Sequence, residues 1–133
     1  MEREPLEGVG AADEHLGRPV PLPAAALPLV RWVEVVASGP GAVQVEWNFD
    51  VSRPESPARL TLYAGVRPAP ERGLPAAQEV GRYAYRQAPL AEAEPEFRPV
   101  QELAWEREGL HLRLTAQGPW VLTELVAIAD SVI

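Results

Sequence analysis

Few side chains in this sequence are of the types that do chemistry near neutral pH, and their spacing does not group them. The chain has no cysteine, and its two histidines lie on separate segments. His111 alternates with leucines in a strand-like stretch, so we expect it to be a solvated partner of a neighbouring strand. His15 precedes Gly17 at the expected end of a short helix, where an imidazolium complements the carbonyl groups. A metal site would require both histidines to converge with a carboxylate such as Asp13 or Glu14, and the spacing does not predict this.

The acidic residues are numerous but poorly placed for catalysis. Glu92, Glu94, Glu96 and Glu102 lie in or beside a proline-rich stretch, where we expect hydration to keep them ionised. We therefore expect a solvated acidic loop rather than a catalytic pair, with weak attraction of divalent cations as a lesser alternative. The serines lack a G-x-S-x-G turn, and the glycines lack the pattern of a phosphate-binding loop. The sequence thus predicts no catalytic residue, no bound metal and no cofactor.

Aromatic side chains offer a candidate binding surface. We expect most of them in the core, because each ring buries a large apolar area. By strand alternation, however, Trp32 and Tyr63 face away from the apolar residues of their own segments. Trp32, Tyr63, Tyr83 and Tyr85 are therefore our candidates for a ligand or partner surface on the second face of a sheet. The alternative that we retain is a scatter of surface aromatic residues.

Composition and charge exclude several classes of function. The 133 residues fit one domain, so we expect a single unit over residues 1–133 with a flexible tail over residues 1–9. A net charge of −7 opposes binding to nucleic acid and to anionic membranes. Arginine is the only cationic residue besides histidine, so lysine-dependent P-loop and Schiff-base chemistry has no lysine to use. No apolar run reaches the roughly 18 residues that a membrane helix needs, so we expect a soluble chain without membrane insertion.

Alternation with period two predicts most of the secondary structure. In residues 43–49, Val43, Val45, Trp47 and Phe49 share one face and polar residues the other. We expect the apolar face to be buried and the polar face to be wet, as in an antiparallel sheet covered on one side. Similar segments predict further strands, and Gly109 suits the turn of the last hairpin. The predicted strands cover residues 29–36, 43–49, 60–64, 80–85, 100–105 and 110–116.

The two ends of the chain are expected to be helical. Apolar residues recur at three- and four-residue spacing from Leu122 to Val132, which predicts an amphipathic helix with Gly118 as its N-cap and Pro119 in its first turn. A shorter helix is predicted over residues 11–17. We therefore expect an α+β fold, in which one curved antiparallel sheet of about five or six strands carries the C-terminal helix on one face.

Two stretches resemble a known pattern. Residues 12–23, ADEHLGRPVPLP, resemble an opening of the form A-x-x-x-x-G followed by P-V-x-x-P. Residues 103–114 and 124–132 are similar to W-x-x-x-G-x-x-Y-x-L and E-L-L-x-I-A-x-S-L. Both are features of a bacterial domain family of unknown function. It commonly forms the extracytoplasmic part of membrane-bound anti-sigma-factor-like proteins and lipoproteins, and it has some likeness to lipoprotein-carrier sheets.

The resemblance implies a scaffold rather than an active site. It assigns structural roles to eight positions and supplies no catalytic residue. These positions are Trp105, Gly109, Leu112, Leu114, Leu125, Ile128, Ala129 and Ser131. It also implies an extracytoplasmic location if the chain is an excised ectodomain, whereas a native start at Met1 implies a cytoplasmic one.

We therefore expect a non-catalytic sensory or protein-interaction domain whose partner is a protein or an apolar small molecule. The alternative is a carrier that encloses a lipid-like molecule between sheet and helix. A carboxylate hydrolase using Glu102 and Asp50 ranks last. A homodimer through exposed strand edges remains open, as do the identity of the ligand and the compartment.

Overall fold

The structure is a computed structural model of the whole chain. It describes residues 4–6, 8–24, 30–49, 58–69, 77–88 and 100–132. The expected acidic loop with Glu92, Glu94 and Glu96, and also Asp50, lie outside these residues. No helix in the described ranges combines the length and the apolar character needed to cross a lipid bilayer.

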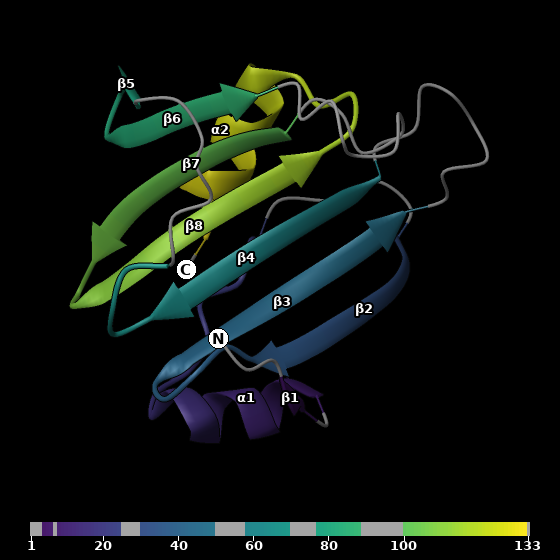
Figure 1. Cartoon of the computed structure of the whole chain (residues 1–133), viewed down its shortest axis with the longest axis vertical. Coiled ribbons are helices and arrows are strands. Elements are labelled where there is room, and N and C mark those ends of the chain that lie inside the picture. Colours follow the sequence, from purple (N-terminus) through teal and green to yellow (C-terminus); the bar gives the residue numbers. More distant parts are fainter. Residues whose placement is uncertain are drawn as a thin grey trace.

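In the described ranges, one antiparallel sheet of eight strands forms the centre of the fold (Figure 1). Its order is β1-β2-β3-β4-β8-β7-β6-β5, so two meanders, β1 to β4 and β5 to β8, meet where β4 pairs with β8. Six strands have six or more residues, which matches the expected number, and two short strands are additional. The bounds are β1 Glu4–Pro5, β2 Val30–Ala37, β3 Ala42–Phe49, β4 Arg59–Gly65, β5 Gln78–Val80, β6 Tyr83–Ala88, β7 Val100–Arg107 and β8 Leu110–Gln117.

The two additional strands correct the sequence prediction. The single strand expected over residues 80–85 is a hairpin of β5 and β6, because Gly81 takes a φ of 60° and turns the chain. The expected tail over residues 1–9 contains β1, which pairs with Val36 and Ala37 of β2. The tight turn between β7 and β8 is confirmed, with Glu108 and Gly109 both at positive φ.

The two helices of the described residues lie on the apolar face of the sheet. Helix α1 spans Gly8–Leu16 and packs on β2 and β3, and helix α2 spans Leu122–Asp130 and lies behind the second meander in Figure 1. The N-cap of α2 is Val121 rather than the expected Gly118, which has a φ of 104° in the turn before the helix. Pro119 therefore also precedes the helix instead of lying in its first turn.

The core fills the space between the helices and the sheet. Leu125, Ile128 and Ala129 of α2 are buried in one cluster with the inward side chains of β3, β4, β7 and β8. The two inner ladder pairs Leu62–Leu114 and Leu103–Leu114 lie at its centre. The expected α+β fold with a C-terminal helix packed on an antiparallel sheet is thus what the structure shows.

Shortening Leu125 to alanine tests this packing. Leu125 is 1% exposed, so we expect Leu125→Ala to lower the free energy of unfolding by about 2–5 kcal/mol, because it leaves a cavity under α2. Val121→Ala is the control, since Val121 is 60% exposed and a surface change of this kind alters stability by roughly 0.5 kcal/mol or less. Denaturation in urea measures both. Equal effects would show that α2 does not seal the sheet.

Candidate functional site

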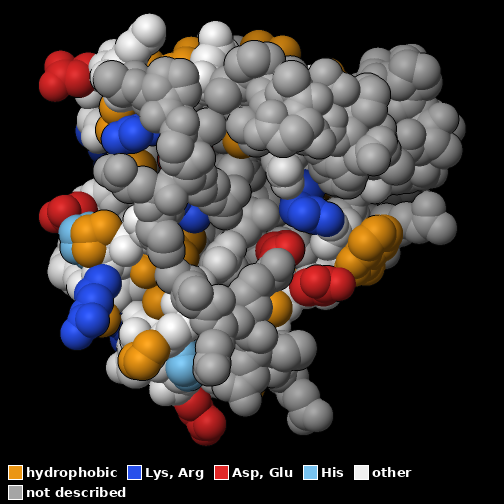
Figure 2. All heavy atoms as spheres, viewed as in Figure 1, with side chains coloured by type: hydrophobic (Ala, Val, Ile, Leu, Met, Phe, Trp, Pro, Cys, Tyr) orange, Lys and Arg blue, Asp and Glu red, His pale blue; other side chains and the backbone are white. Residues whose placement is uncertain are grey.

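The sheet face opposite the helices is polar, but it is not wet. Glu46 and Asn48 of β3, Thr61 of β4 and Thr115 of β8 point to this face, and each is 7% exposed or less. The expectation of a solvated second face was therefore wrong for the middle of the sheet. Alternation identifies the chemical character of a face, whereas its exposure depends on what the rest of the chain places over it. Figure 2 looks onto this face, where basic and acidic side chains are interspersed.

A cavity of about 330 Å³ lies on this polar face, over the second meander and β4. Its size is at the lower end of pockets that hold small molecules. The cavity is partly open, and four strands and the segment after β4 contribute to it. It is lined by Tyr63, Pro68, Ala69, Arg86, Glu102, Ala104, Trp105, Glu106, His111, Leu112 and Arg113.

Small side chains in the middle of the sheet create the hollow. Ala104 of β7 pairs with Ala84 of β6 on one side and with Arg113 of β8 on the other. Along β7 itself, Ala104 stands between Glu102 and Glu106, whose longer side chains share its face by strand alternation. The cavity is therefore deepest at Ala104, and the charged side chains of Glu102 and Glu106 flank it.

Tyr63 forms a wall of the cavity and is held on three sides. Its hydroxyl donates a hydrogen bond of 2.7 Å to the carbonyl oxygen of Arg67, in the segment that leaves β4. Its ring lies across Gly65, where a Cβ atom would stand 2.8 Å from the ring carbon Cζ. The Arg113 guanidinium lies 5.8 Å from the ring centroid, which is within cation–π range. Gly65 is thus required by the close approach of Tyr63.

The charged groups of the cavity lie at opposite ends of the stretch of β7 that forms its floor. At one end, His111 Nδ1 is 3.2 Å from Glu106 Oε1, and the Glu106 side chain is 74% exposed. At the other end, Glu102 pairs across the ladder with Thr115 and with Arg86. Glu102 is 6% exposed, so the expectation that hydration surrounds it was wrong. It lies within a strand buried on both faces rather than in a loop.

The four aromatic candidates do not share one surface. Tyr63 is buried in the cavity wall, and Trp32 lies on the same polar face but on β2, where it is 48% exposed. Tyr83 and Tyr85 point to the helix face and belong to the core. Because β6 begins at Tyr83, after the Gly81 turn, both of these tyrosines have the parity of Leu103 and Trp105.

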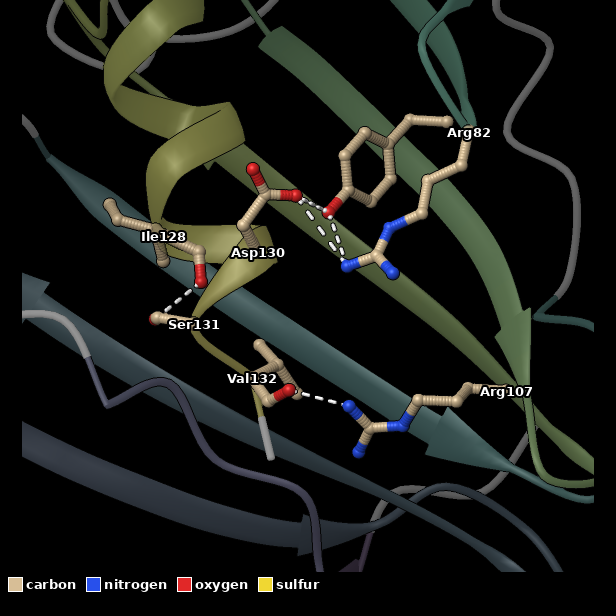
Figure 3. A network of polar contacts seen from close by, with 7 residues as sticks. Arg82, Arg107, Ile128, Asp130, Ser131 and Val132 are labelled. Carbon is tan, nitrogen blue, oxygen red and sulfur yellow. Dashed lines mark hydrogen bonds and ion pairs between the residues drawn. The ribbon is translucent and has the colours of Figure 1, made fainter.

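Tyr83 joins the end of α2 to β6 through Asp130, which Figure 3 shows beside Arg82. Its hydroxyl donates to Asp130 Oδ1, and Arg82 lies 3.5 Å from the same oxygen. The Arg107 guanidinium donates to the carbonyl oxygen of Val132. These contacts join the end of α2 to β6 and the backbone at Val132 to β7. Tyr83 therefore has a structural role.

The histidines and the remaining carboxylates do not form a metal site in the described part of the chain. His15 Nε2 lies 2.7 Å from the carbonyl oxygen of Gly39, whereas His111 Nδ1 lies beside Glu106. Asp13 accepts a hydrogen bond from the backbone of Val20. Over the described ranges, no group of three or more potential ligands comes together.

Sequence reasoning missed Arg86, Glu106 and Arg113 as cavity residues. The alternation of charged residues about Ala104 was the available signal.

Burial raises the pKa of all three tyrosines of the chain above the usual value of 10.0. For Tyr63 the nearby Arg113 opposes this effect, and for Tyr83 the hydrogen bond to Asp130 adds to it. Ionisation of a tyrosine is therefore disfavoured in the folded state. The unfolded chain loses its phenolic protons first, so stability is unaffected below about pH 10 and falls as pH rises above it.

We expect the phenolate absorbance of the folded chain to rise at higher pH than that of the unfolded chain, because the midpoint of each tyrosine is shifted upward. In denaturant the three should titrate together near pH 10. A spectrophotometric titration of native and unfolded protein measures the difference. A tyrosine that titrates normally in the native state would contradict the burial of that side chain.

Gly65→Ala should displace Tyr63 from the cavity wall. The new methyl group would meet the tyrosine ring and also Ala42 Cβ at 2.9 Å. We expect a loss of about 1–3 kcal/mol in the free energy of unfolding, typical of overpacking. Gly10→Ala is the matched control, because Gly10 lies in α1 with nothing within 4 Å of a Cβ, and alanine there should stabilise the helix by up to about 1 kcal/mol. Chemical denaturation compares them, and equal stability of Gly65→Ala and the parent would refute the close approach.

Comparisons with known proteins do not assign the chain to a family. A scan against protein-family models, a search of curated proteins and a search of solved structures each found no match for the chain. The resemblance of the two ends to the extracytoplasmic bacterial family therefore stays a prediction.

Proposed function

We propose that this chain is a non-catalytic binding domain that senses a small polar molecule in the cavity beside Tyr63, and binds it without transforming it. The observation that supports this most is the partly open cavity of about 330 Å³ on the polar face, with charged side chains around a floor of alanine. A sensory role agrees with what the resemblance to anti-sigma-like ectodomains implies.

The polar character of the site favours this proposal over the apolar carrier. A carrier for a lipid-like molecule would need space on the apolar face, between sheet and helices. In the described ranges that face is occupied by the packed core of strands and helices. The cavity instead lies on the opposite face, where Arg86, Arg113, Glu102 and Glu106 would oppose a purely apolar ligand.

A protein-interaction role is the second candidate, and one feature of β2 favours it. Trp32 and Val33 are adjacent and each is about half exposed. Within the described residues, β1 pairs only with Val36 and Ala37 of this strand. A partner strand that paired with the preceding part of β2 would cover both side chains.

Filling the cavity tests the proposed function. A mixture of small polar metabolites is screened against the isotope-labelled chain by NMR, and we expect shifts at Glu102 to Glu106 and at His111 to Arg113. Ala104→Leu should occupy the hollow and weaken binding about tenfold or more. Ala127→Leu places the same change on an exposed position of α2 and should leave binding unchanged.

The location of the shifts and the fate of the ligand decide between the candidates. Shifts confined to Trp32 and Val33 on addition of a protein partner, with none in the cavity, would favour the interaction role. A ligand that is converted to product would overturn the non-catalytic proposal. Binding that Ala104→Leu leaves intact would overturn the assignment of the cavity.

A further inference from the structure

Glu102 presents a carboxylate to the cavity, and within the described ranges no hydrogen bond or ion pair joins it to another residue. Its side chain lines the cavity, and the residue is 6% exposed. Thr115 and Arg86 stand opposite it in the ladder. A carboxylate in a partly enclosed cavity interacts more strongly with a cationic group than one in open water does, because the local dielectric constant is lower. Because the Glu102 side chain lines the cavity, a ligand in the cavity can reach its carboxylate.

The opposite charge is presented by the side of the cavity that lies toward β4. Arg113 is 7% exposed, and its guanidinium lies over the Tyr63 ring. Stacking of this kind holds the planar guanidinium in one orientation, in which its N–H groups project within its own plane. A carboxylate is the ligand group that such a fork binds best. Arg86 adds a second positive charge to the same cavity.

The cavity therefore offers both signs of charge within a small volume. Among the described lining residues, Arg86 and Arg113 stand against Glu102 and Glu106, so a ligand of either sign alone would meet repulsion as well as attraction. The chain carries a net charge of −7, which further disfavours a purely anionic ligand. Ala104, Pro68 and Ala69 supply a short apolar surface between the charged groups.

We infer that the ligand is a small zwitterion, an amine and a carboxylate on a short aliphatic frame such as an α-amino acid. Its ammonium group pairs with Glu102, and its carboxylate binds Arg113. The volume of about 330 Å³ suits a molecule of this size. This inference rests on the proposed function, because it names the class of molecule that the same cavity binds.

Three probes on the native chain test the ligand class without any substitution. α-Aminobutyrate carries both charges, propylamine lacks its carboxylate, and butyrate lacks its amine. We expect calorimetry to show that α-aminobutyrate binds about tenfold or more tightly than either of the others. If butyrate or propylamine binds as tightly as α-aminobutyrate, or if none of the three binds, the zwitterion assignment is overturned.

Glu102→Gln tests the role of the carboxylate at nearly constant size. We expect it to weaken binding of α-aminobutyrate about tenfold or more and to leave butyrate unchanged. The variant should unfold at the same denaturant concentration as the parent, because the change keeps the size of the side chain and breaks no hydrogen bond to another described residue. Glu124→Gln, on the exposed side of α2, makes the same change away from the cavity and should alter neither affinity.

The two proposals fail in different ways. An unchanged affinity of Glu102→Gln for α-aminobutyrate overturns the assignment of the ammonium to Glu102. If the metabolite screen still finds a ligand that Ala104→Leu excludes, the cavity remains a binding site for another class of molecule. If the screen finds no cavity ligand either, the proposed function falls with the inference.

Discussion

Burial of the central sheet on both faces is the constraint on which the rest of the structure depends. On one face, leucines and valines pack against α1 and α2, and this packing needs no specific partner atoms. On the other face, Glu46, Thr61, Thr115 and Glu102 are removed from water although they are polar. Such groups are stable only where hydrogen bonds or charges compensate for lost hydration. The polar face therefore holds buried side chains that need a hydrogen-bonding or charged partner.

The cavity follows from the sizes of side chains on neighbouring strands. Ala84 and Ala104 adjoin one another in the ladder, and their small side chains leave a space between longer ones. Tyr63 closes one side because Gly65 lets its ring lie flat, and the carbonyl oxygen of Arg67 holds its hydroxyl. A wall held by packing and by a hydrogen bond is preorganised. Binding then loses little side-chain entropy.

Tyr63 and Tyr83 have different roles because they lie on opposite faces of the sheet. Tyr63 belongs to the cavity, whereas Tyr83 fastens α2 to the sheet through Asp130. An aromatic residue with a polar tip suits both positions, since its ring can be buried while its hydroxyl reaches a partner. Only the face on which a tyrosine lies separates the two roles. The turn at Gly81 decides that face for Tyr83.

The amino-acid sequence by itself determined the six longer strands, the C-terminal helix and the polar character of the second face, because these depend on local periodicity. Tertiary structure alone decided that β4 pairs with β8, which places Tyr63 beside Arg113 although they are distant in the chain. It also decided that Glu102 is buried rather than hydrated. Strand order and burial depend on contacts between distant segments, and a local pattern carries no information about which segments meet.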